Sequence, residues 1–550
     1  MTSTARLRPK VVTPKTIAEL AAKFPLEVHH GTSRECGSGD SETVERPITG
    51  LASDNRDIVV GEMFAALPGF TVHGAKFASE ATKRGASAIL TDHHGASLSA
   101  ESGFGGEIPV LVATDVRKHF GPIAAHIYGS PAEQMRTFAV TGTNGKTTTA
   151  YLLQHLLSAL GLKTGLIGTV EMRSGDKVLP AKLTTPDAAD LQAILATMYE
   201  DHVDALAMEV SSHALALHRV DGVVYSVAGF TNLSQDHLDY HKTLEDYFAA
   251  KALLFTPEHA HQGVVSIDDK WGRELAQLAT IPVITLQTPY GDAPNGTADW
   301  EVTDVQNTGH GSSFTLINHK DGSLGELKTH TSLPGTFNVQ NAALALVMVL
   351  ASGVPVAQLN AALQQVGGLN PIVPGRMEVI SDGRGANEPR VIVDFAHNTE
   401  ALREALGSLQ DRTGAGKLVV LFGAAGERDQ GKRPAMGAAA VAGADVVYLT
   451  DDDPHGEDAQ HIRDCVLVGI RPAIEQAKAA GRVVEFYEIG DRRDAIHTSI
   501  HAAAPVDTVL LAGRGHETIQ QVGHEDIYLD DRVEARAALA ARANVQGAIR

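Results

Sequence analysis

Cysteine is almost absent from this chain, which has only Cys36 and Cys465 among its 550 residues. Two cysteines cannot form a disulfide framework or a cysteine-based zinc site, and their scarcity favours a reducing compartment. No uninterrupted apolar run reaches the roughly 18 residues that a membrane-spanning helix needs. No basic segment followed by an apolar stretch opens the chain, so a signal peptide is not expected. These absences predict a cytoplasmic location and no membrane partner.

Positive charge is also scarce, with 46 Lys and Arg against 66 Asp and Glu and a formal net charge of −20. Such a balance repels a phosphate backbone, so we expect no nucleic acid as a partner. The hydrophobic share of 43% is enough to bury full cores. The length corresponds to about three domains.

The spacing of apolar runs and turn residues divides the chain into three α/β units. The first, residues 1–134, combines a helical pattern over 75–84 with short strand-like runs and predicts a small α/β domain. In the second, residues 135–373, strand-like runs such as 205–210 and 224–231 alternate with helical patterns. That alternation predicts a parallel doubly wound sheet with ligands at the strand ends.

The third unit, residues 374–550, again alternates strand-like runs, such as 446–449 and 483–485, with alanine-rich helical patterns. It should form a second, Rossmann-like parallel sheet. Residues 299–331 of the second unit depart from this pattern, because polar and apolar residues alternate there between glycine-rich turns. We expect a strand-rich insertion at that point.

A phosphate-binding loop begins the second unit, in the run Phe138-Ala-Val-Thr-Gly-Thr-Asn-Gly-Lys-Thr-Thr148. An apolar strand breaks into a glycine-containing turn, and a helical pattern follows at once. Backbone N–H groups and the positive helix end then converge on a phosphate, Lys146 adds charge, and the Thr147 hydroxyl can reach Mg²⁺. The strict pattern has glycine where Val140 stands, so this is a shorter variant. We interpret it as an ATP site rather than an ordinary β–α turn.

Polar side chains follow two further apolar runs. Glu209 ends one of them, where a carboxylate could bind Mg²⁺ beside the phosphate loop; a solvated glutamate is the alternative. Asn232, Asp236 and His237 follow the other, although a lone histidine is more often structural. Lys251 lies in an otherwise apolar helical stretch. Burial there would lower its pKa and let CO₂ carbamylate the amine, whereas snorkelling toward solvent is the alternative.

The order and spacing of these motifs resemble those of the Mur ligases. The shared segments are Gly142-Thr-Asn-Gly-Lys-Thr147, Glu209-Val-Ser-Ser-His213, Asn232-Leu-Ser-Gln-Asp-His237, Lys251, Gly335-Thr-Phe-Asn-Val-Gln-Asn341, Gly375-Arg-Met-Glu378, Asp394-Phe-Ala-His397 and Gly513-Arg-Gly-His-Glu517. Together they look like the MurE type of that family, and the resemblance covers about residues 48–540.

The resemblance implies a three-domain, ATP- and Mg²⁺-dependent amide-bond ligase of peptidoglycan precursor synthesis. A small uridine-binding α/β domain would precede a central P-loop-type ATPase domain and a C-terminal Rossmann-like domain. The substrate would be UDP-MurNAc-L-Ala-D-Glu, which a diamino acid extends. ATP would phosphorylate the D-Glu side-chain carboxylate, and the amine would attack the acyl phosphate through a tetrahedral intermediate. The protein would supply positioning and charge neutralisation, and we expect it to be a monomer.

The resemblance also implies roles for individual residues. ATP contacts would be Gly142, Thr143, Asn144, Gly145, Lys146, Thr147, Thr148, Asn341, Arg376 and Asp394. Lys146, Glu209, His237 and Lys251 would be catalytic, with Thr147, Glu209 and carbamylated Lys251 at the metal. The UDP-sugar peptide would bind at Ser53, Asn55, Thr184, Thr185, Ser211 and Arg219. Two departures are Asn55, where serine is common, and Leu217, where glutamine often contacts the substrate.

The incoming amino acid would meet Arg428, Asp452, Asp453, His455, Gly513 and Glu517. Family members that add meso-diaminopimelate carry Asp-Asn-Pro-Arg in this segment, and the arginine grips the second carboxylate of that substrate. Here Asp453 replaces the asparagine and His455 the arginine, so a firm cation is lost and an anion is added. We therefore predict L-lysine, with L-ornithine close behind. meso-Diaminopimelate is the alternative if Arg428 or another cation takes over.

Two other functions fit parts of the sequence. Folylpolyglutamate synthetases share the ATP loop, but they usually have glycine where Thr147 stands and lack a uridine-binding N-terminal domain. A non-catalytic relative would use ATP only as a ligand. The presence of Lys146, both candidate metal-binding residues and Lys251 argues against that.

Overall fold

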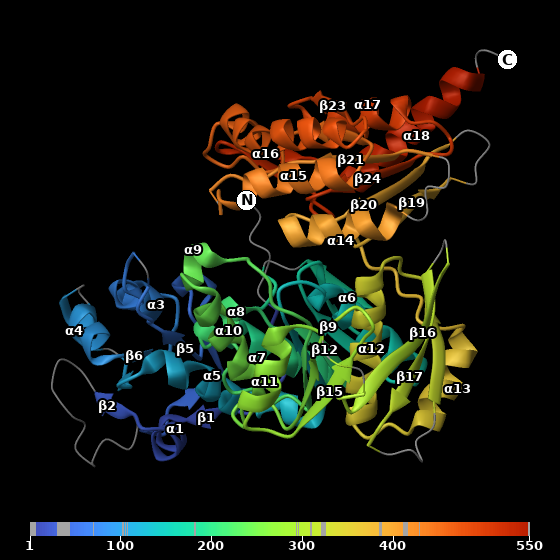
Figure 1. The fold of residues 1–550 in the computed structure, drawn as a ribbon. Coiled ribbons are helices and arrows are strands. Elements are labelled where there is room, and N and C mark those ends of the chain that lie inside the picture. The colour runs from blue at the N-terminus through green and yellow to red at the C-terminus, as the bar shows by residue number, and fades with distance from the viewer. Residues whose placement is uncertain are drawn as a thin grey trace.

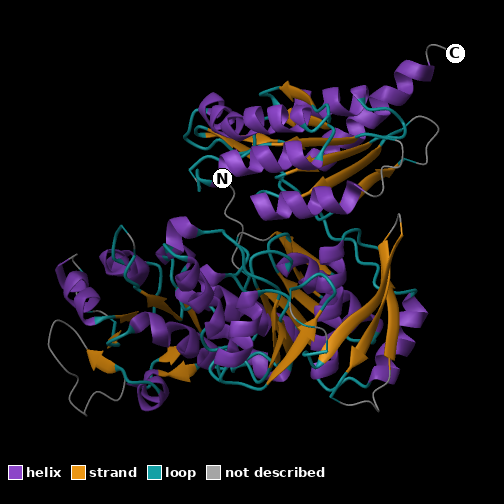
Figure 2. Cartoon of the chain, viewed as in Figure 1, coloured by secondary structure: helices purple, strands orange, loops and turns teal. Residues whose placement is uncertain are grey.

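Three large β-sheets follow one another along the chain, each with helices packed against it (Figure 1, Figure 2). The computed structural model describes residues 7–29, 44–69, 71–101, 104, 106, 108–180, 183–292, 294, 296–308, 311–320, 326–383, 388–410, 416–427 and 429–547. The N-terminal unit lies beside the central unit, and the C-terminal unit lies against another side of it (Figure 1). Among the helices of these residues, none is long and apolar enough to cross a membrane.

The N-terminal sheet has the strand order β2-β7-β6-β5-β4. Its strands are β2 (Glu27–His29), β4 (Gly50–Ala52), β5 (Glu62–Ala65), β6 (Ala88–Thr91) and β7 (Val110–Val112), and only β2 pairs antiparallel to its neighbour. Two short strands, β1 (Lys15–Thr16) and β3 (Pro47–Ile48), pair separately. The helices are α1 (Ile17–Lys23), α3 (Ala78–Lys83), α4 (His93–Glu101) and α5 (Val116–Ile127).

The central sheet has the order β11-β10-β9-β12-β8-β13-β14-β15-β16-β17-β18. Its parallel strands are β8 (Arg136–Thr141), β9 (Thr164–Ile167), β12 (Ala205–Glu209), β13 (Val227–Phe230), β14 (Gly263–Ser266), β15 (Val283–Gln287) and β16 (Trp300–Thr308). Antiparallel strands extend both edges: β10 (Glu171–Ser174) and β11 (Lys177–Pro180) at one, β17 (Gly311–Asn318) and β18 (Glu326–Thr331) at the other. The strand-rich stretch predicted at 299–331 therefore continues this sheet.

Helices cover both faces of the central sheet, which confirms the doubly wound arrangement (Figure 2). On one face lie α6 (Lys146–Ala159), α12 (Thr336–Ala351) and α13 (Val356–Val366). On the other lie α7 (Ala188–Glu200), α10 (Leu244–Ala252) and α11 (Lys270–Leu278). Two short helices, α8 (Ser212–Ala216) and α9 (Leu238–His241), come after β12 and β13. Because α12 is apolar almost all round, it is buried along most of its length.

The C-terminal sheet has the order β19-β20-β24-β21-β22-β23. Its strands are β19 (Glu378–Asp382), β20 (Arg390–Asp394), β21 (Leu418–Phe422), β22 (Val446–Leu449), β23 (Glu485–Glu488) and β24 (Thr508–Ala512), and only β19 is antiparallel. Helices α14 (Thr399–Gln410), α15 (Lys432–Gly443) and α16 (Ala459–Ala479) cover one face, α17 (Arg492–Ala502) and α18 (Asp531–Gly547) the other. A hairpin of β25 (Ile519–Val522) and β26 (Glu525–Tyr528) precedes α18. Figure 1 shows α14 between this sheet and the central unit.

Three predicted elements differ from the observed ones. The helix expected over 75–84 is a 3₁₀ turn (Gly74–Phe77) followed by α3. The strand expected over 224–231 shortens to β13. The strand expected at 483–485 begins only at Glu485, where pairing with β22 starts. For the two strands, pairing with the neighbouring strand, rather than the local run of apolar residues, sets the boundary.

Candidate active site

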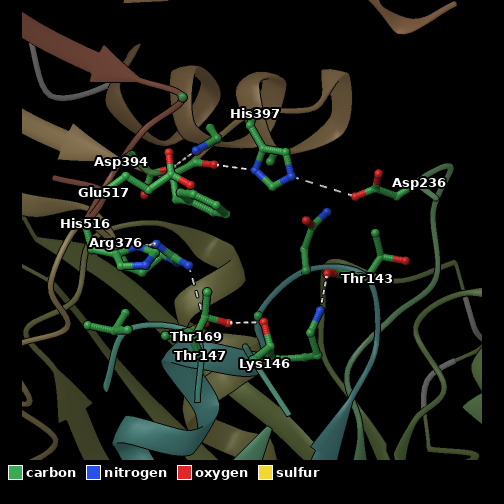
Figure 3. A pocket seen from close by; sticks show the side chains of 18 of the residues that line it. Thr143, Lys146, Thr147, Thr169, Asp236, Arg376, Asp394, His397, His516 and Glu517 are labelled. Carbon is green, nitrogen blue, oxygen red and sulfur yellow. Dashed lines mark hydrogen bonds and ion pairs between the residues drawn. The ribbon is translucent and has the colours of Figure 1, made fainter. Parts of the chain in front are cut away.

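A cavity of about 1010 Å³ lies between the central and C-terminal units (Figure 3). Most residues predicted from the sequence line it: Thr143, Asn144, Gly145, Lys146, Thr147, Thr148, Thr184, Glu209, Ser211, His237, Lys251, Asn341, Arg376, Asp394, Asp452, Asp453, His455, Gly513 and Glu517. Gly142, Ser53, Asn55, Thr185 and Arg219 are not among the lining residues. Arg428 lies outside the described residues.

The phosphate loop joins β8 to α6 and has no room for side chains at its two glycines. Gly142 has φ +147°, and a Cβ there would lie 1.9 Å from the Thr231 Oγ1. Gly145 has φ +90°, and a Cβ there would lie 2.3 Å from the Asn341 Oδ1. Asn232, which follows the neighbouring strand β13, fixes the loop. Its carbonyl accepts from the Thr143 N–H at 2.9 Å, and its Oδ1 accepts from the Asn144 N–H at 3.0 Å. The loop is thus held in one conformation by its neighbours.

Two lysines converge on this loop. The Nζ of Lys146 donates to the carbonyls of Gly142 and Thr143 at 3.0 Å and 2.9 Å. The Nζ of Lys251, a side chain 1% exposed on α10, donates to the Gly142 carbonyl at 2.7 Å and lies 4.3 Å from the Tyr247 ring centre. Burial lowers the pKa of both amines, and at Lys251 the nearby Lys146 lowers it further. Lys251 is therefore buried, as carbamylation would require, and its side chain does not extend toward solvent.

Glu209 ends β12 beside the loop and is 1% exposed. Its Oε2 accepts from the Thr147 Oγ1 at 3.0 Å and from the Thr169 Oγ1 at 2.9 Å, and its Oε1 accepts from the Thr169 N–H at 2.8 Å. A carboxylate and a threonine hydroxyl are hard oxygen donors, so this pair fits Mg²⁺. Sequence reasoning missed Thr169, although it follows the end of β9 just as Glu209 ends β12.

His237 follows β13 and opens onto the cavity, with 43% of its side chain accessible. Burial of the ring, with a smaller effect of the nearby Lys146, lowers its pKa to about 4 against the opposing charge of Asp236, so the imidazole is neutral near pH 7. Burial alone would raise the pKa of Asp236, but His237 and His397 outweigh it and hold that pKa at about 2. A neutral imidazole beside an ionised carboxylate can act as a ligand or a proton acceptor.

The C-terminal unit reaches the phosphate loop directly (Figure 3). The Arg376 guanidinium lies 4.1 Å from the Phe395 ring centre, and its Nη2 donates to the Thr147 Oγ1 at 3.4 Å. The Asn398 Nδ2, which sequence reasoning missed, donates to the Asn144 Oδ1 at 3.4 Å. These contacts bring groups of both units to the position where the loop would hold phosphates.

One further contact joins the units, and another holds the C-terminal unit in shape beside it. His397 Nε2 lies 3.9 Å from the Asp236 Oδ2. The Asp394 carboxylate accepts from the backbone N–H groups of Met377 and Ala396 at 2.7 Å and 2.9 Å, so it also holds the turn that carries Arg376.

Three carboxylates gather at the other end of the cavity. Oxygens of Asp452, Asp453 and Glu517 lie within 4.8 Å of one another. Burial, together with Asp452 and Asp453, raises the pKa of Glu517 to about 8. The buried guanidinium of Arg514 forms an ion pair with the Asp453 carboxylate. The anion that Asp453 adds to this pocket is therefore paired with Arg514, which lies in the Gly513-Arg-Gly-His-Glu517 motif.

The residues predicted for the UDP-sugar peptide fall into two groups. Thr184 and Ser211 line the cavity. Thr185 is buried behind it, where its Oγ1 donates to the Glu209 carbonyl at 3.0 Å. In the N-terminal unit, the Ser53 Oγ donates to the Asp187 Oδ2 at 3.2 Å, just before α7, and Asn55 is buried in a short 3₁₀ turn. The structure thus places Ser53 at a junction between the N-terminal and central units.

Family models match three consecutive parts of the chain. The Mur ligase family catalytic domain matches residues 47–120, the Mur ligase middle domain 140–349, and the Mur ligase glutamate ligase domain 375–515. The chain is 41% identical over 534 residues to a UDP-N-acetylmuramyl-tripeptide synthetase of Leifsonia xyli subsp. xyli, covering 97% of each. It is 40% identical over 533 residues to a UDP-N-acetylmuramoyl-L-alanyl-D-glutamate–2,6-diaminopimelate ligase of Streptomyces avermitilis, covering 97% of this chain and 98% of the relative.

Solved structures agree with these matches. A UDP-N-acetylmuramoyl-L-alanyl-D-glutamate–2,6-diaminopimelate ligase superposes with a TM-score of 0.62 at 29% identity, covering 96% of this chain and all of that one. A Mycobacterium tuberculosis folylpolyglutamate synthase shares the fold with a TM-score of 0.55 at 18% identity, covering 71% of this chain and 90% of its own. That likeness is one of fold, whereas the relatives matched over nearly their whole length are Mur ligases. The chain belongs to the Mur ligase family and is an ATP-dependent ligase of its MurE type.

Proposed function

We propose that this ligase joins a diamino acid to UDP-MurNAc-L-Ala-D-Glu, with ATP converted to ADP and phosphate. The observation that supports this most directly is a single cavity shared by the phosphate loop, Glu209 and the acidic cluster at Glu517. Relatives that match over 97% of this chain are named for that reaction or its tripeptide product. One cavity is what a reaction needs if a phosphoryl group, a carboxylate and an amine must meet.

The first step would transfer the γ-phosphoryl group of ATP to the D-Glu side-chain carboxylate. Backbone N–H groups of the loop, Lys146 and Arg376 would hold and neutralise the phosphates. Asn341, which is buried on α12 beside Gly145, would contact the adenine end. The amine of the incoming amino acid would then attack the acyl phosphate, form the amide bond and release phosphate.

We propose Mg²⁺ as the cofactor, held by Thr147, Glu209 and a carbamylated Lys251. When bound, it would neutralise charge on the phosphates. Lys251 and Glu209 are both 1% exposed. His237, neutral at pH 7, would lie beside the transferring group. Thr184, Thr185, Ser211 and Arg219 of the central unit, with Ser53 and Asn55 of the N-terminal unit, would bind the UDP-sugar peptide.

L-Lysine is the amino acid that we propose first, because His455 replaces the arginine that would grip a second carboxylate. meso-Diaminopimelate is a second candidate on two observations. The ion pair with Arg514 offsets part of the negative charge of Asp453, and the Streptomyces avermitilis relative is named a 2,6-diaminopimelate ligase. In either case Asp452 and Glu517, with Gly513 beside Asp452, would receive an ammonium group.

For the chain as a whole, we propose domain boundaries at 1–134, 135–373 and 374–550, a monomeric state and a cytoplasmic location. The location would fit a reaction that consumes ATP and a nucleotide-linked precursor.

The test is phosphate release from the purified protein with ATP, Mg²⁺, UDP-MurNAc-L-Ala-D-Glu and each of L-lysine, L-ornithine and meso-diaminopimelate. Release should depend on both the UDP-linked dipeptide and one of the amino acids. Release that requires neither would contradict the proposed function, and so would release with a folate and glutamate in their place.

A further inference from the structure

The recognition segment, residues 451–457, carries three predicted amino-acid contacts but belongs to no helix or strand. Its only regular pairing among the described residues is an isolated bridge between His455 and Val522. His455 has φ +51°, a backbone conformation that side-chain-bearing residues rarely adopt. Neighbouring elements must therefore hold this segment in place, because its own backbone does not favour the observed shape.

Glu457 anchors the segment on one side. Its Oε2 accepts from the Arg433 Nη2 at 2.7 Å, and its Oε1 accepts from the Gln430 Nε2 at 2.9 Å and from the Glu427 N–H at 3.3 Å. Arg433 is fully buried at the start of α15. Its Nε and Nη1 have no hydrogen-bond partner within the described part of the chain. The Glu457 carboxylate thus compensates a buried charge.

The loop before α15 and the recognition segment lie so close together that Gly426 has no room for a side chain. The Gly426 N–H donates to the Asp453 carbonyl at 2.8 Å. A Cβ at Gly426 would lie 1.9 Å from the Pro454 carbonyl oxygen, and one at Gly456 would lie 2.6 Å from the Glu427 Oε1. The loop before α15 therefore fits against the recognition segment without a gap.

The hairpin of β25 and β26 holds the segment from its other side. The His455 N–H donates to the Gln521 carbonyl at 3.0 Å, and the His455 carbonyl accepts from the Gly523 N–H at 2.6 Å. Gln520, only 8% exposed, donates through its Nε2 to the Asp452 carbonyl at 2.6 Å. A buried side chain therefore fixes the backbone next to two of the predicted contacts.

We propose that Glu457, through its ion pair with Arg433, and Gln520 are positioning residues that hold the recognition segment from two sides and so set selectivity for the incoming amino acid. The proposal rests on the proposed function, because it takes Asp452, Asp453 and His455 as the amino-acid site. Glu457, Arg433 and Gln520 are not among the residues that line the cavity, so they act through the segment. Their loss should change recognition of the amino acid and leave recognition of ATP intact.

The experiment compares Glu457→Gln and Gln520→Leu with wild type in full-length protein, by phosphate release with ATP, UDP-MurNAc-L-Ala-D-Glu and each of the three amino acids. Both variants should raise KM for the preferred amino acid by about 10-fold or more, since small displacements of a positioned group have effects of that order. In both variants the kcat/KM values for L-lysine, L-ornithine and meso-diaminopimelate should differ less from one another than in wild type. KM for ATP should stay near the wild-type value.

Glu485→Gln is the matched control, because Glu485 forms an ion pair with Lys417 at 2.5 Å elsewhere in the same unit. It should behave as wild type. If Glu457→Gln fails to fold, Gln520→Leu decides the matter, since it removes a hydrogen bond without leaving a charge unpaired.

Two results would overturn the proposal. One is an unchanged KM and preference in both variants. The other is a lower Tm with no change in the ratio of the KM values for amino acid and ATP. Failure of the proposed function itself looks different, because the wild-type protein would then release no phosphate with any of the three amino acids.

Discussion

The ammonium groups of Lys146 and Lys251 donate to the same oxygen, the carbonyl of Gly142. Two buried like charges at one acceptor disfavour each other, and this is part of why the pKa of Lys251 falls well below its ordinary value. A neutral amine can add CO₂. The resulting carbamate would carry a negative charge that attracts Lys146, so the modification would relieve the conflict between the two lysines.

Lys251→Ala should therefore lose activity by on the order of 10²–10³-fold, because a charge fixed beside the phosphates is removed. Added acetate or bicarbonate should restore part of it, by filling the space with a small carboxylate. Lys270→Ala is a suitable control, since Lys270 also lies over an aromatic ring, that of Trp271, but outside the cavity. Full activity in Lys251→Ala would contradict this role.

Lys146→Ala and Glu209→Gln should each reduce kcat by on the order of 10²–10³-fold, because each removes a preorganised charge at the transferring group. Glu209→Gln keeps the volume and part of the hydrogen bonding to Thr147 and Thr169, so the fold should survive. Circular dichroism and Tm check the fold, and phosphate release checks the rate. A rate within a few-fold of wild type in either variant would place the reaction elsewhere.

Wild-type protein should use L-lysine with the highest kcat/KM, followed by L-ornithine, because one methylene is worth only about 1–3 kcal/mol. His455→Arg should raise the relative use of meso-diaminopimelate by roughly 10-fold, since a guanidinium pairs bidentately with a carboxylate. Ligation assays at equal concentrations of the three amino acids measure both effects. The prediction is wrong if meso-diaminopimelate already gives the highest kcat/KM with the wild-type protein.

The stability of the protein should depend on pH through Glu517. Burial and the neighbouring Asp452 and Asp453 raise its folded-state pKa to about 8, far above its ordinary value of 4.5. Between these two pH values the unfolded chain has lost the proton that the folded chain keeps, so the stabilising contribution falls as pH rises. It is fully present below pH 4.5 and lost above about pH 8.

The substitution Glu517→Gln removes this titration, and comparing its Tm with that of wild type tests the prediction. Its Tm, relative to that of wild type, should rise from pH 5 to about pH 8 and then level off up to pH 9. A difference between the two Tm values that stays constant over this range would show that Glu517 is ionised at neutral pH, with an ordinary pKa.

Local sequence determined the parts of this protein that depend on neighbours along the chain. The run from Phe138 to Ser158 forms a strand, a glycine loop and a helix. The apolar residues of the strand are buried in the sheet, and Gly142 and Gly145 adopt the positive φ angles that the turn requires and that other residues rarely reach. Glu209 ends a buried strand as predicted, and Lys251 lies buried on an apolar helix. The sequence was also sufficient to recognise the resemblance to the Mur ligases, because its motifs keep their order over nearly the whole chain.

Only the tertiary structure decided which distant groups meet. Asn232 holds the phosphate loop across 88 positions of sequence, Arg376 reaches Thr147 across 229, and Arg514 neutralises Asp453 across 61. No local pattern encodes such contacts, because they follow from the order of strands in a sheet and from how two units pack. The charge of Asp453 is the clearest case: alone in the sequence it is one more anion, and in the folded protein it is half of an ion pair.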